Sequence, residues 1–154
     1  MPLFRHERRV RHNAVQMFDL VADVERYPEF VPLCQSLQVR RRATDAAGVE
    51  VLTADMKVGY LAIRESFTTR VTLDRTNLKI LVEYIDGPFS WLENVWTFTA
   101  EGEAKTSRVE FFIDYEFRSR TLGALMGSMF DAAFRRFAVA FERRADKVYG
   151  TAVG

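Results

Sequence analysis

The middle of the chain alternates apolar and polar residues with a period of two, which is the pattern of β-strands that bury one face. The clearest run covers residues 108–118, and similar runs cover residues 52–58, 63–73 and 78–84. Aspartate, asparagine and glycine gather between these runs, as they do in tight turns. Short turns between successive strands predict an antiparallel meander of about six strands.

Apolar residues take helical spacing in the segment before the meander. Asn13 can cap a helix by accepting a hydrogen bond from a free backbone N–H, and an apolar stripe follows over residues 14–21. Pro28 and Pro32 each lack a backbone donor and restrict the residue before them. The helix should therefore end near Val24.

The other segments are assigned by the same periodicities. Residues 4–11 predict a weak strand, too charged to be buried on both faces, and residues 26–30 predict at most a short helical turn. After Ser119 an apolar stripe at helical spacing runs over residues 122–145, and Gly150 is well placed to stop that helix. A helix of this length spans about 40 Å, enough to cross a whole sheet.

Together these elements predict the fold class α+β. The sequence has no internal repeat, no low-complexity segment and no linker, so we expect one domain over residues 1–154, with residues 151–154 as a frayed tail. One face of the sheet and one stripe of the long helix must be hidden. A strongly curved antiparallel sheet of about six to seven strands, wrapped around the C-terminal helix, satisfies both needs.

Charge and cysteine content argue against several classes of protein, among them strongly basic nucleic-acid binders and disulfide-linked secreted proteins. The 22 lysines and arginines nearly balance the 21 aspartates and glutamates, which argues against a protein-wide field for nucleic acid or acidic membranes. A single cysteine cannot form an intrachain disulfide, and the N-terminus lacks the apolar stretch of a signal peptide. No apolar run approaches the roughly 18 residues of a membrane span. We expect a soluble intracellular protein.

Few residues offer catalytic or metal-binding chemistry. His6 and His12 would lie about 20 Å apart on a strand, so they cannot share a metal, and we expect both to be solvated. Cys34 has no recognised catalytic context, and a lone cysteine is more often a small buried hydrophobe. Phosphate-binding and nucleophile-elbow motifs do not occur. We therefore predict no catalytic residue, no metal site and no cofactor, and hence no enzyme.

The residues predicted to face inward are almost all apolar, so the interior is either a solid core or an apolar cavity. Methionine and alanine on the long helix are compatible with either, and sequence alone leaves both open. A Gly87–Pro88 turn is followed by Phe89 and Trp91 in what should be a polar connection. Exposed apolar loop tips often bind something, so we expect this loop and the segment 27–33 to rim one cavity mouth.

Three stretches of the sequence resemble a known family. They are QMFDLVADVERYPEFVPLCQSLQV (residues 16–39), GPFSWLENVWTF (87–98) and FERRADKVYG (141–150). With the strand pattern they cover residues 3 to 150. The chain resembles the helix-grip, START-like superfamily, and more narrowly the coenzyme-Q-binding START-domain proteins and their relatives, the RatA-type ribosome association toxins. These motifs do not separate the two branches.

Resemblance to the quinone-binding branch implies binding of ubiquinone without chemistry on it, in support of quinone synthesis or delivery to the respiratory chain. An apolar tunnel would accept an isoprenoid tail, and aromatic side chains near the mouth would contact the quinone ring. The motif positions that carry over are Tyr27, Pro28, Phe30, Pro32, Cys34, Pro88, Phe89, Leu92, Trp96 and Phe98. The predicted ligand contacts are Tyr27, Phe30, Leu33, Phe67, Val71, Tyr84, Phe89, Trp91, Leu92, Trp96, Phe98, Phe111, Ile113, Tyr115, Met126, Met129, Phe130, Ala133 and Phe137.

Resemblance to the toxin branch implies binding to the large ribosomal subunit and a block on subunit joining. Phosphate binding would then draw on arginine clusters. The candidates are Arg5, Arg8, Arg9, Arg11, Arg40, Arg41 and Arg42. A third alternative, a polyketide cyclase or aromatase, is weakened by the lack of inward acids, bases and histidines. The expected location is the cytoplasm, with transient contact at the inner membrane surface, and no DNA partner is expected.

Overall fold

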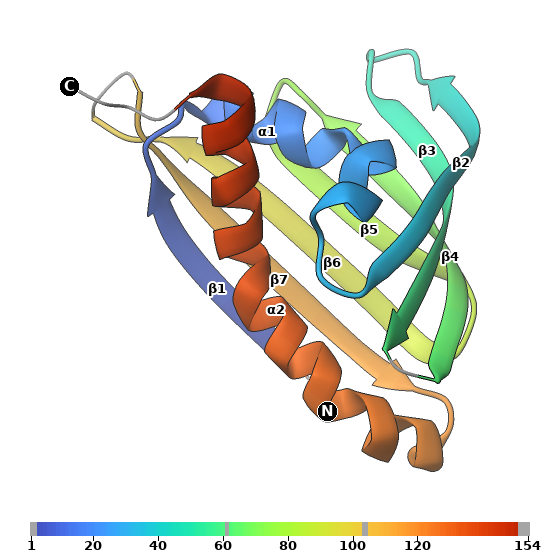
Figure 1. Ribbon diagram of the computed structural model, residues 1–154. Coiled ribbons are helices and arrows are strands. Elements are labelled where there is room, and N and C mark those ends of the chain that lie inside the picture. Colours follow the sequence, from blue (N-terminus) through green and yellow to red (C-terminus); the bar gives the residue numbers. More distant parts are fainter. Residues whose placement is uncertain (1–2, 61, 103–104, 151–154) are drawn as a thin grey trace.

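A single curved sheet grips one long helix in the computed structural model, which describes residues 3–60, 62–102 and 105–150 (Figure 1). The elements in chain order are β1 (Leu3–Val10), α1 (Ala14–Ala22), the 3₁₀ helix η1 (Val24–Glu29), β2 (Cys34–Thr44), β3 (Glu50–Tyr60), β4 (Ile63–Asp74), β5 (Lys79–Asp86), β6 (Phe89–Ala100), β7 (Ser107–Phe117) and α2 (Arg120–Tyr149). The predicted α+β class and the antiparallel meander closed by a terminal helix are confirmed.

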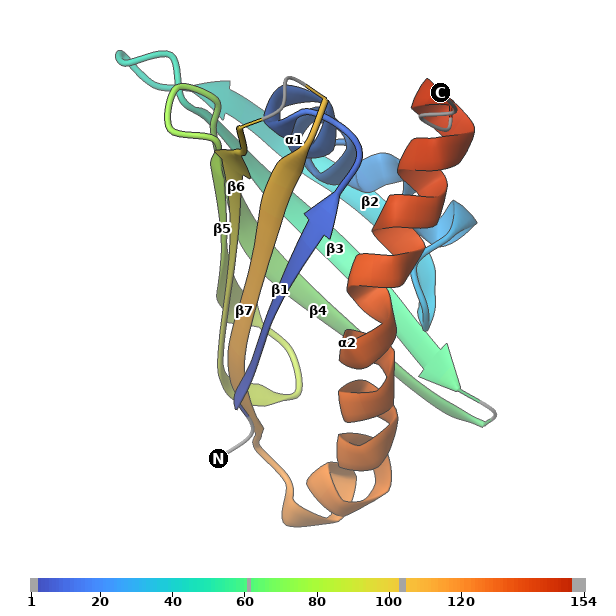
Figure 2. The same cartoon turned by 90° about the vertical axis from the view of Figure 1, so that its left-hand side faces the viewer.

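The seven strands lie in the order β1-β7-β6-β5-β4-β3-β2, and every neighbouring pair is antiparallel. Strands β2 to β7 follow one another as a meander, and only β1 departs from chain order because it pairs with β7. The charged β1 is thus an edge strand, as its sequence predicted. Figure 2 shows β1 beside β7, with α2 running across the concave side of the sheet.

Local capping sets the bounds of α1 and η1. The Asn13 side chain accepts from the Gln16 backbone N–H at 2.8 Å, and the Gln16 side chain accepts from the Asn13 backbone N–H at 3.1 Å. This reciprocal capping box confirms the predicted start of the helix. α1 ends at Ala22, and η1 then absorbs Pro28, so the short turn expected at residues 26–30 begins two residues earlier.

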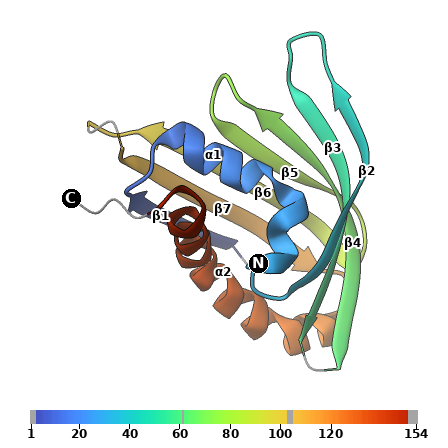
Figure 3. The ribbon, with the colours of Figure 1, turned by 45° about the horizontal axis from the view of Figure 1, so that its top comes forward.

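Helix α2 buries one long aromatic and alanine face against the concave side of the sheet. The Ser119 hydroxyl caps its first turn by accepting from Leu122 N–H at 3.2 Å. The helix ends at Tyr149 and is followed by Gly150, which has a φ of 85°. Its buried residues are Met126, Phe130, Ala133, Phe134, Ala138, Phe141 and Ala145. Figure 3, viewed from above, shows α1 and α2 lying on the same face of the sheet.

One ion pair and one side-chain hydrogen bond join the C-terminal half of α2 to the N-terminal segment. The Arg8 guanidinium lies 2.6 Å from the Glu142 carboxylate, and His12 Nε2 lies 2.7 Å from Asp146 Oδ1. The expectation that His12 is solvated was wrong, since its side chain is only 4% exposed. Its backbone carbonyl also accepts a 2.8 Å hydrogen bond from the Ser107 hydroxyl, which anchors the segment over β7.

The predicted apolar loop after Gly87 is in fact the start of β6. Gly87 has a φ of 142°, and a Cβ on it would lie 2.5 Å from the Phe67 Cβ, so only glycine allows so close a turn. The strand therefore resumes directly at Phe89, whose side chain is fully buried. The prediction that Phe89 lies at an exposed rim was wrong.

Candidate ligand-binding cavity

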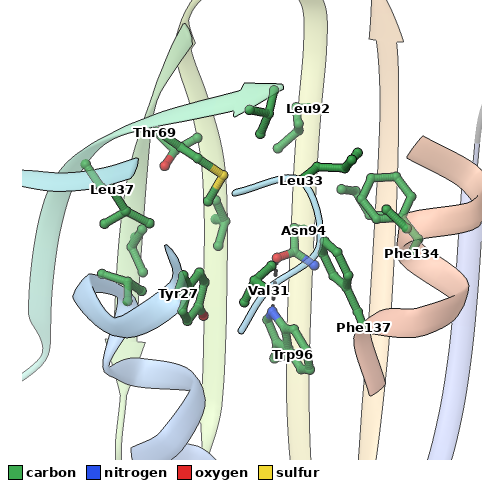
Figure 4. A pocket seen from close by; sticks show the side chains of 18 of the residues that line it. Tyr27, Val31, Leu33, Leu37, Thr69, Leu92, Asn94, Trp96, Phe134 and Phe137 are labelled. Atoms are coloured by element: carbon green, nitrogen blue, oxygen red, sulfur yellow. Dashed lines mark hydrogen bonds between the residues drawn. The ribbon is translucent and has the colours of Figure 1, made fainter. Parts of the chain in front are cut away.

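An apolar cavity of about 110 Å³ lies between the sheet, α2 and the segment from η1 to the start of β2 (Figure 4). Strands β3 to β7 form one wall, α2 forms the second, and the segment 24–37 lies across the third. The lining residues are Val24, Tyr27, Val31, Pro32, Leu33, Leu37, Ala54, Met56, Val58, Phe67, Thr69, Val71, Ile80, Val82, Leu92, Asn94, Trp96, Phe111, Ile113, Phe130, Ala133, Phe134, Phe137 and Phe141. The interior is therefore hollow rather than solid.

Polar groups are few in this lining. Asn94 donates through Nδ2 to the Phe112 carbonyl at 2.8 Å and accepts from Trp96 Nε1 at 3.1 Å. The Tyr27 hydroxyl donates to the Val21 carbonyl at 2.5 Å, and burial raises the pKa of this phenol so that it stays protonated. Thr69, only 6% exposed, supplies the remaining hydroxyl. No described lining residue is an acid, a histidine, a lysine or an arginine.

The segment 30–33 lies at the partly exposed side of the cavity. Pro32 and Leu33 are half-buried and line it, and Leu33 takes a φ of 69°, a conformation that costs a non-glycine residue about 1–3 kcal/mol. Its carbonyl accepts from Gly59 N–H at 3.0 Å, which ties the segment to β3. Phe30 packs edge-on against Phe141 of α2 at 5.0 Å between ring centroids, so the segment bridges sheet and helix.

More than half of the predicted ligand contacts do line the cavity. These are Tyr27, Leu33, Phe67, Val71, Leu92, Trp96, Phe111, Ile113, Phe130, Ala133 and Phe137. They come from the segment 27–33, from the three strands β4, β6 and β7, and from α2. The period-two and helical patterns therefore assigned the inward faces of these strands and of α2 correctly. Their role as ligand contacts stays a prediction.

The other predicted contacts lie outside the lining. Phe30, Tyr84, Phe89, Phe98, Tyr115, Met126 and Met129 pack elsewhere in the core or at its edge. Phe89 stacks on Phe117 with centroids 4.8 Å apart, and Tyr84 accepts the Phe89 N–H at 3.2 Å. Trp91 was also misplaced, because a bulge between Phe89 and Trp91 accompanies its turn to the outer face, where its Nε1 lies 3.4 Å from Asp114 Oδ1.

Sequence reasoning missed the two polar residues of the wall, Thr69 and Asn94. The signal was available, since Thr69 stands in phase with Phe67 and Val71, and Asn94 stands in phase with Leu92 and Trp96. The missed apolar lining residues are Val24, Val31, Pro32, Leu37, Ala54, Met56, Val58, Ile80, Val82, Phe134 and Phe141. Several of these come from the η1–β2 segment, whose irregular backbone has no periodicity to reveal its inward side.

Cys34 is buried and does not line the cavity. Desolvation raises the pKa of its thiol from an ordinary value of 9.0 to about 11, which disfavours the nucleophilic thiolate. Over the described residues, no three histidine, cysteine or acidic side chains are grouped so that they could hold a metal ion. Within the same part of the chain, no helix is long and apolar enough to cross a membrane.

The predicted arginine candidates do not form one basic surface. Arg5, Arg8, Arg9 and Arg11 belong to β1 or follow it, whereas Arg40–Arg42 lie on β2, at the opposite edge of the sheet. Arg8 turns inward to Glu142, and Arg5 lies 5.0 Å from the centre of the Phe112 ring.

The β2 run is itself divided, at a register shift between Val39 and Arg41. Arg40 pairs with Asp55 of the neighbouring strand, and Arg42 pairs with Glu25 of η1. Exposed Arg41 forms no ion pair with any residue that the structure describes.

Comparison with models of protein families gives a match that covers most of the chain. The family described as "polyketide cyclase / dehydrase and lipid transport" matches residues 10–142, which include every wall of the cavity. The chain belongs to this family. The fold is shared with a START superfamily protein from Mycobacterium smegmatis, which superposes with a TM-score of 0.78 at 18% identity, over 95% of this chain and 98% of that one.

Closer relatives of this family member fall into both branches suggested by its motifs. It is 33% identical over 149 residues to the ribosome association toxin RatA of Escherichia coli K12, covering 97% of this chain and 90% of that protein. It is 30% identical over 138 residues to the mitochondrial coenzyme Q-binding protein COQ10 homolog B of Xenopus laevis, covering 88% of this chain and 54% of that protein. The 18 kDa protein CC1736 from Caulobacter crescentus is 34% identical, with a TM-score of 0.79 over 98% of this chain and all of that one.

Proposed function

We propose that this protein binds a lipophilic molecule, ubiquinone or a similar polyprenyl lipid, in the cavity and performs no chemistry on it. The observation that carries this proposal is the apolar cavity between α2 and the sheet, which is partly open at one side. In the cell, the protein would support quinone biosynthesis or delivery to the respiratory chain. It would work in the cytoplasm and make transient contact with the surface of the inner membrane.

The energetics of the lining suit an apolar ligand. Each CH₂ group moved from water into such a wall contributes about 0.8 kcal/mol, and aromatic faces add contacts to any flat ring. The cavity of about 110 Å³ resembles in size the ~150 Å³ engineered cavity that holds benzene. It therefore has room for one ring or a few carbon units, and the rest of a polyprenyl chain would leave past Leu33 or widen the space.

The chemistry of the lining supports a binding role over catalysis. General acid–base catalysis needs a side chain that titrates near the working pH and reaches the substrate. In the described lining, Tyr27 is the one titratable group, and its hydroxyl is committed to the Val21 carbonyl. The cyclase alternative would therefore have to work without a positioned acid or base.

The decisive experiment is lipid extraction of protein purified from its native host, followed by mass spectrometry. The matched variants are Ala133→Leu, which fills the cavity, and Ala132→Leu, which adds the same group on the exposed side of α2. We expect near-stoichiometric quinone with the wild type and Ala132→Leu, and at least a tenfold loss with Ala133→Leu. Equal recovery from both variants would remove the cavity as the binding site, and absence of lipid from the wild type would refute the proposal.

A second candidate function is association with the large ribosomal subunit, which is favoured by the similarity to RatA over nearly the whole chain. Binding would depend on exposed arginines that are not already paired, such as Arg9, Arg11 and Arg41. Overexpression should then reduce the fraction of joined ribosomes in a sucrose gradient. Arg41→Glu should restore joining while leaving quinone recovery unchanged. An unaltered gradient with the wild type would argue against this function.

A further inference from the structure

Two side chains interrupt the apolar wall that the sheet presents to the cavity. Thr69 of β4 and Asn94 of β6 both line it, and both are at least nine-tenths buried (Figure 4). The inward residues before and after them on their strands are Phe67, Val71, Leu92 and Trp96. A polar group at such a position is unfavourable unless it has a hydrogen-bond partner.

Thr69 has no such partner within the protein. Its hydroxyl forms no hydrogen bond with any residue that the structure describes, although the neighbouring Thr68 hydroxyl donates to Asp55 at 2.6 Å on the outer face. Valine has the same shape and would fill this space without leaving a hydroxyl unpaired. A bulge between Thr68 and Thr69 in the pairing with β5 further singles out this point of the wall. The unpaired hydroxyl is thus available to a group inside the cavity.

Asn94 is available in a different way, because its orientation is already fixed. Its Oδ1 accepts from Trp96, and one of the two N–H groups on Nδ2 donates to the Phe112 carbonyl. An amide nitrogen carries two donors, so the second N–H remains. Asn94, whose amide is held in place by two hydrogen bonds, thus keeps one donor without a partner among the described residues, and Thr69 keeps one rotatable hydroxyl.

The separation of the two donors selects the shape of the ligand. β4 and β6 flank β5, where Thr69 pairs with Tyr84 and Asn94 pairs with Val82. The two backbones therefore stand about 10 Å apart across the strands and about 7 Å apart along them, or about 12 Å in all. Two carbonyl oxygens at opposite ends of a six-membered ring, each accepting one hydrogen bond, span about 11 Å between donors. A simple alcohol or a fatty-acid chain offers one polar end and could reach only one of them.

We propose that Thr69 and Asn94 hydrogen-bond the two opposite carbonyl oxygens of a quinone ring that enters the cavity first, with its tail toward Leu33. This inference rests on the proposed function and deepens it. It reverses the arrangement expected from the sequence, in which the ring stays at the mouth and the tail lies within. The cavity of about 110 Å³ leaves most of the tail outside, and it would have to widen for the methyl and methoxy groups of a ubiquinone ring.

The test uses decylubiquinone and decylbenzene, which share the same tail, against the wild type, Thr69→Val and Thr69→Ser. Thr69→Val should weaken decylubiquinone binding roughly three- to tenfold, the range of one neutral hydrogen bond, and leave decylbenzene binding unchanged. Thr69→Ser should restore the affinity for decylubiquinone. The infrared C=O band of bound decylubiquinone should move in Thr69→Val toward its position in an apolar solvent.

The outcomes separate this inference from the proposed function. If the wild type binds decylubiquinone but Thr69→Val changes neither the affinity nor the carbonyl band, the head-first arrangement is wrong and quinone binding stands. If Thr69→Val weakens the binding of decylubiquinone and decylbenzene equally, Thr69 contributes only packing. This result would also overturn the head-first arrangement. If the wild type binds neither probe, the proposed function itself fails.

Discussion

Replacement of Phe89 by alanine should destabilise the fold by about 3–5 kcal/mol, the usual cost of removing a buried phenylalanine ring. The side chain is fully buried, and its ring lies within 6.2 Å, centroid to centroid, of aromatic rings from β4, β5, β7 and α2. Because four different elements surround it, none can move in to fill the cavity without losing its other contacts. The upper half of the range is therefore expected.

This loss is large against a total stability of about 5–15 kcal/mol for a domain. Urea unfolding followed by circular dichroism measures it directly, and the melting temperature should fall by roughly 8–20 °C for a chain of this size. Phe112→Ala is the matched control, because it deletes the same ring from the outer face, where Phe112 is only partly buried beneath Arg5. A loss below about 1 kcal/mol for Phe89→Ala, or equal losses for the two variants, would refute the reasoning.

Two further predictions concern the thiol and the tight turn. Burial raises the pKa of the Cys34 thiol to about 11 in the folded protein. The buried neutral thiol therefore stabilises the folded state fully below pH 9, and this stabilisation is lost as the pH rises to about 11. The unfolding free energy should fall by about 2–3 kcal/mol more over that interval in the wild type than in Cys34→Ala, and identical urea titrations would contradict the raised pKa. Gly87→Ala should lower the free energy of unfolding, measured by thermal unfolding, by at least about 2 kcal/mol, because both the positive φ and the contact with Phe67 oppose a Cβ. Gly102→Ala is the control and should be nearly neutral, because a Cβ there meets nothing within 4 Å.

Periodicity was sufficient to predict the architecture because burial of one face is enforced along every strand and along α2. The burial of β7 alternates from Ser107 to Phe117 without interruption, and the inward residues predicted there, Phe111, Ile113 and Tyr115, are all buried. The start of β6 was misread for a different reason. Whether Phe89 belongs to a loop or a strand depends on how closely Gly87 approaches Phe67, a residue twenty positions earlier, and no local pattern reports that distance.

Some features of the candidate site could likewise be predicted from the local sequence pattern, and others could not. The alternation of their strands was sufficient to predict that Thr69 and Asn94 face inward. It could not predict that Thr69 lacks a hydrogen-bond partner while Asn94 has two, because that depends on which groups surround each side chain. The cavity itself is a difference between the volume enclosed by the elements and the volume of the side chains. No short stretch of sequence can predict such a difference in volume, because it depends on how all the elements pack together.

The position of α2 after all seven strands has a consequence for when a ligand can be taken up. His12 and Asp146, which join the two ends of the fold, are 134 residues apart in sequence, and β1 cannot pair until β7 has been synthesised. Contacts this distant form late and slow folding, because a long loop must close first. During translation the sheet wall is complete before α2, which supplies the opposite wall, has left the ribosome. The cavity therefore comes into being only after α2 has been synthesised and has packed on the sheet, and ligand uptake must follow that step.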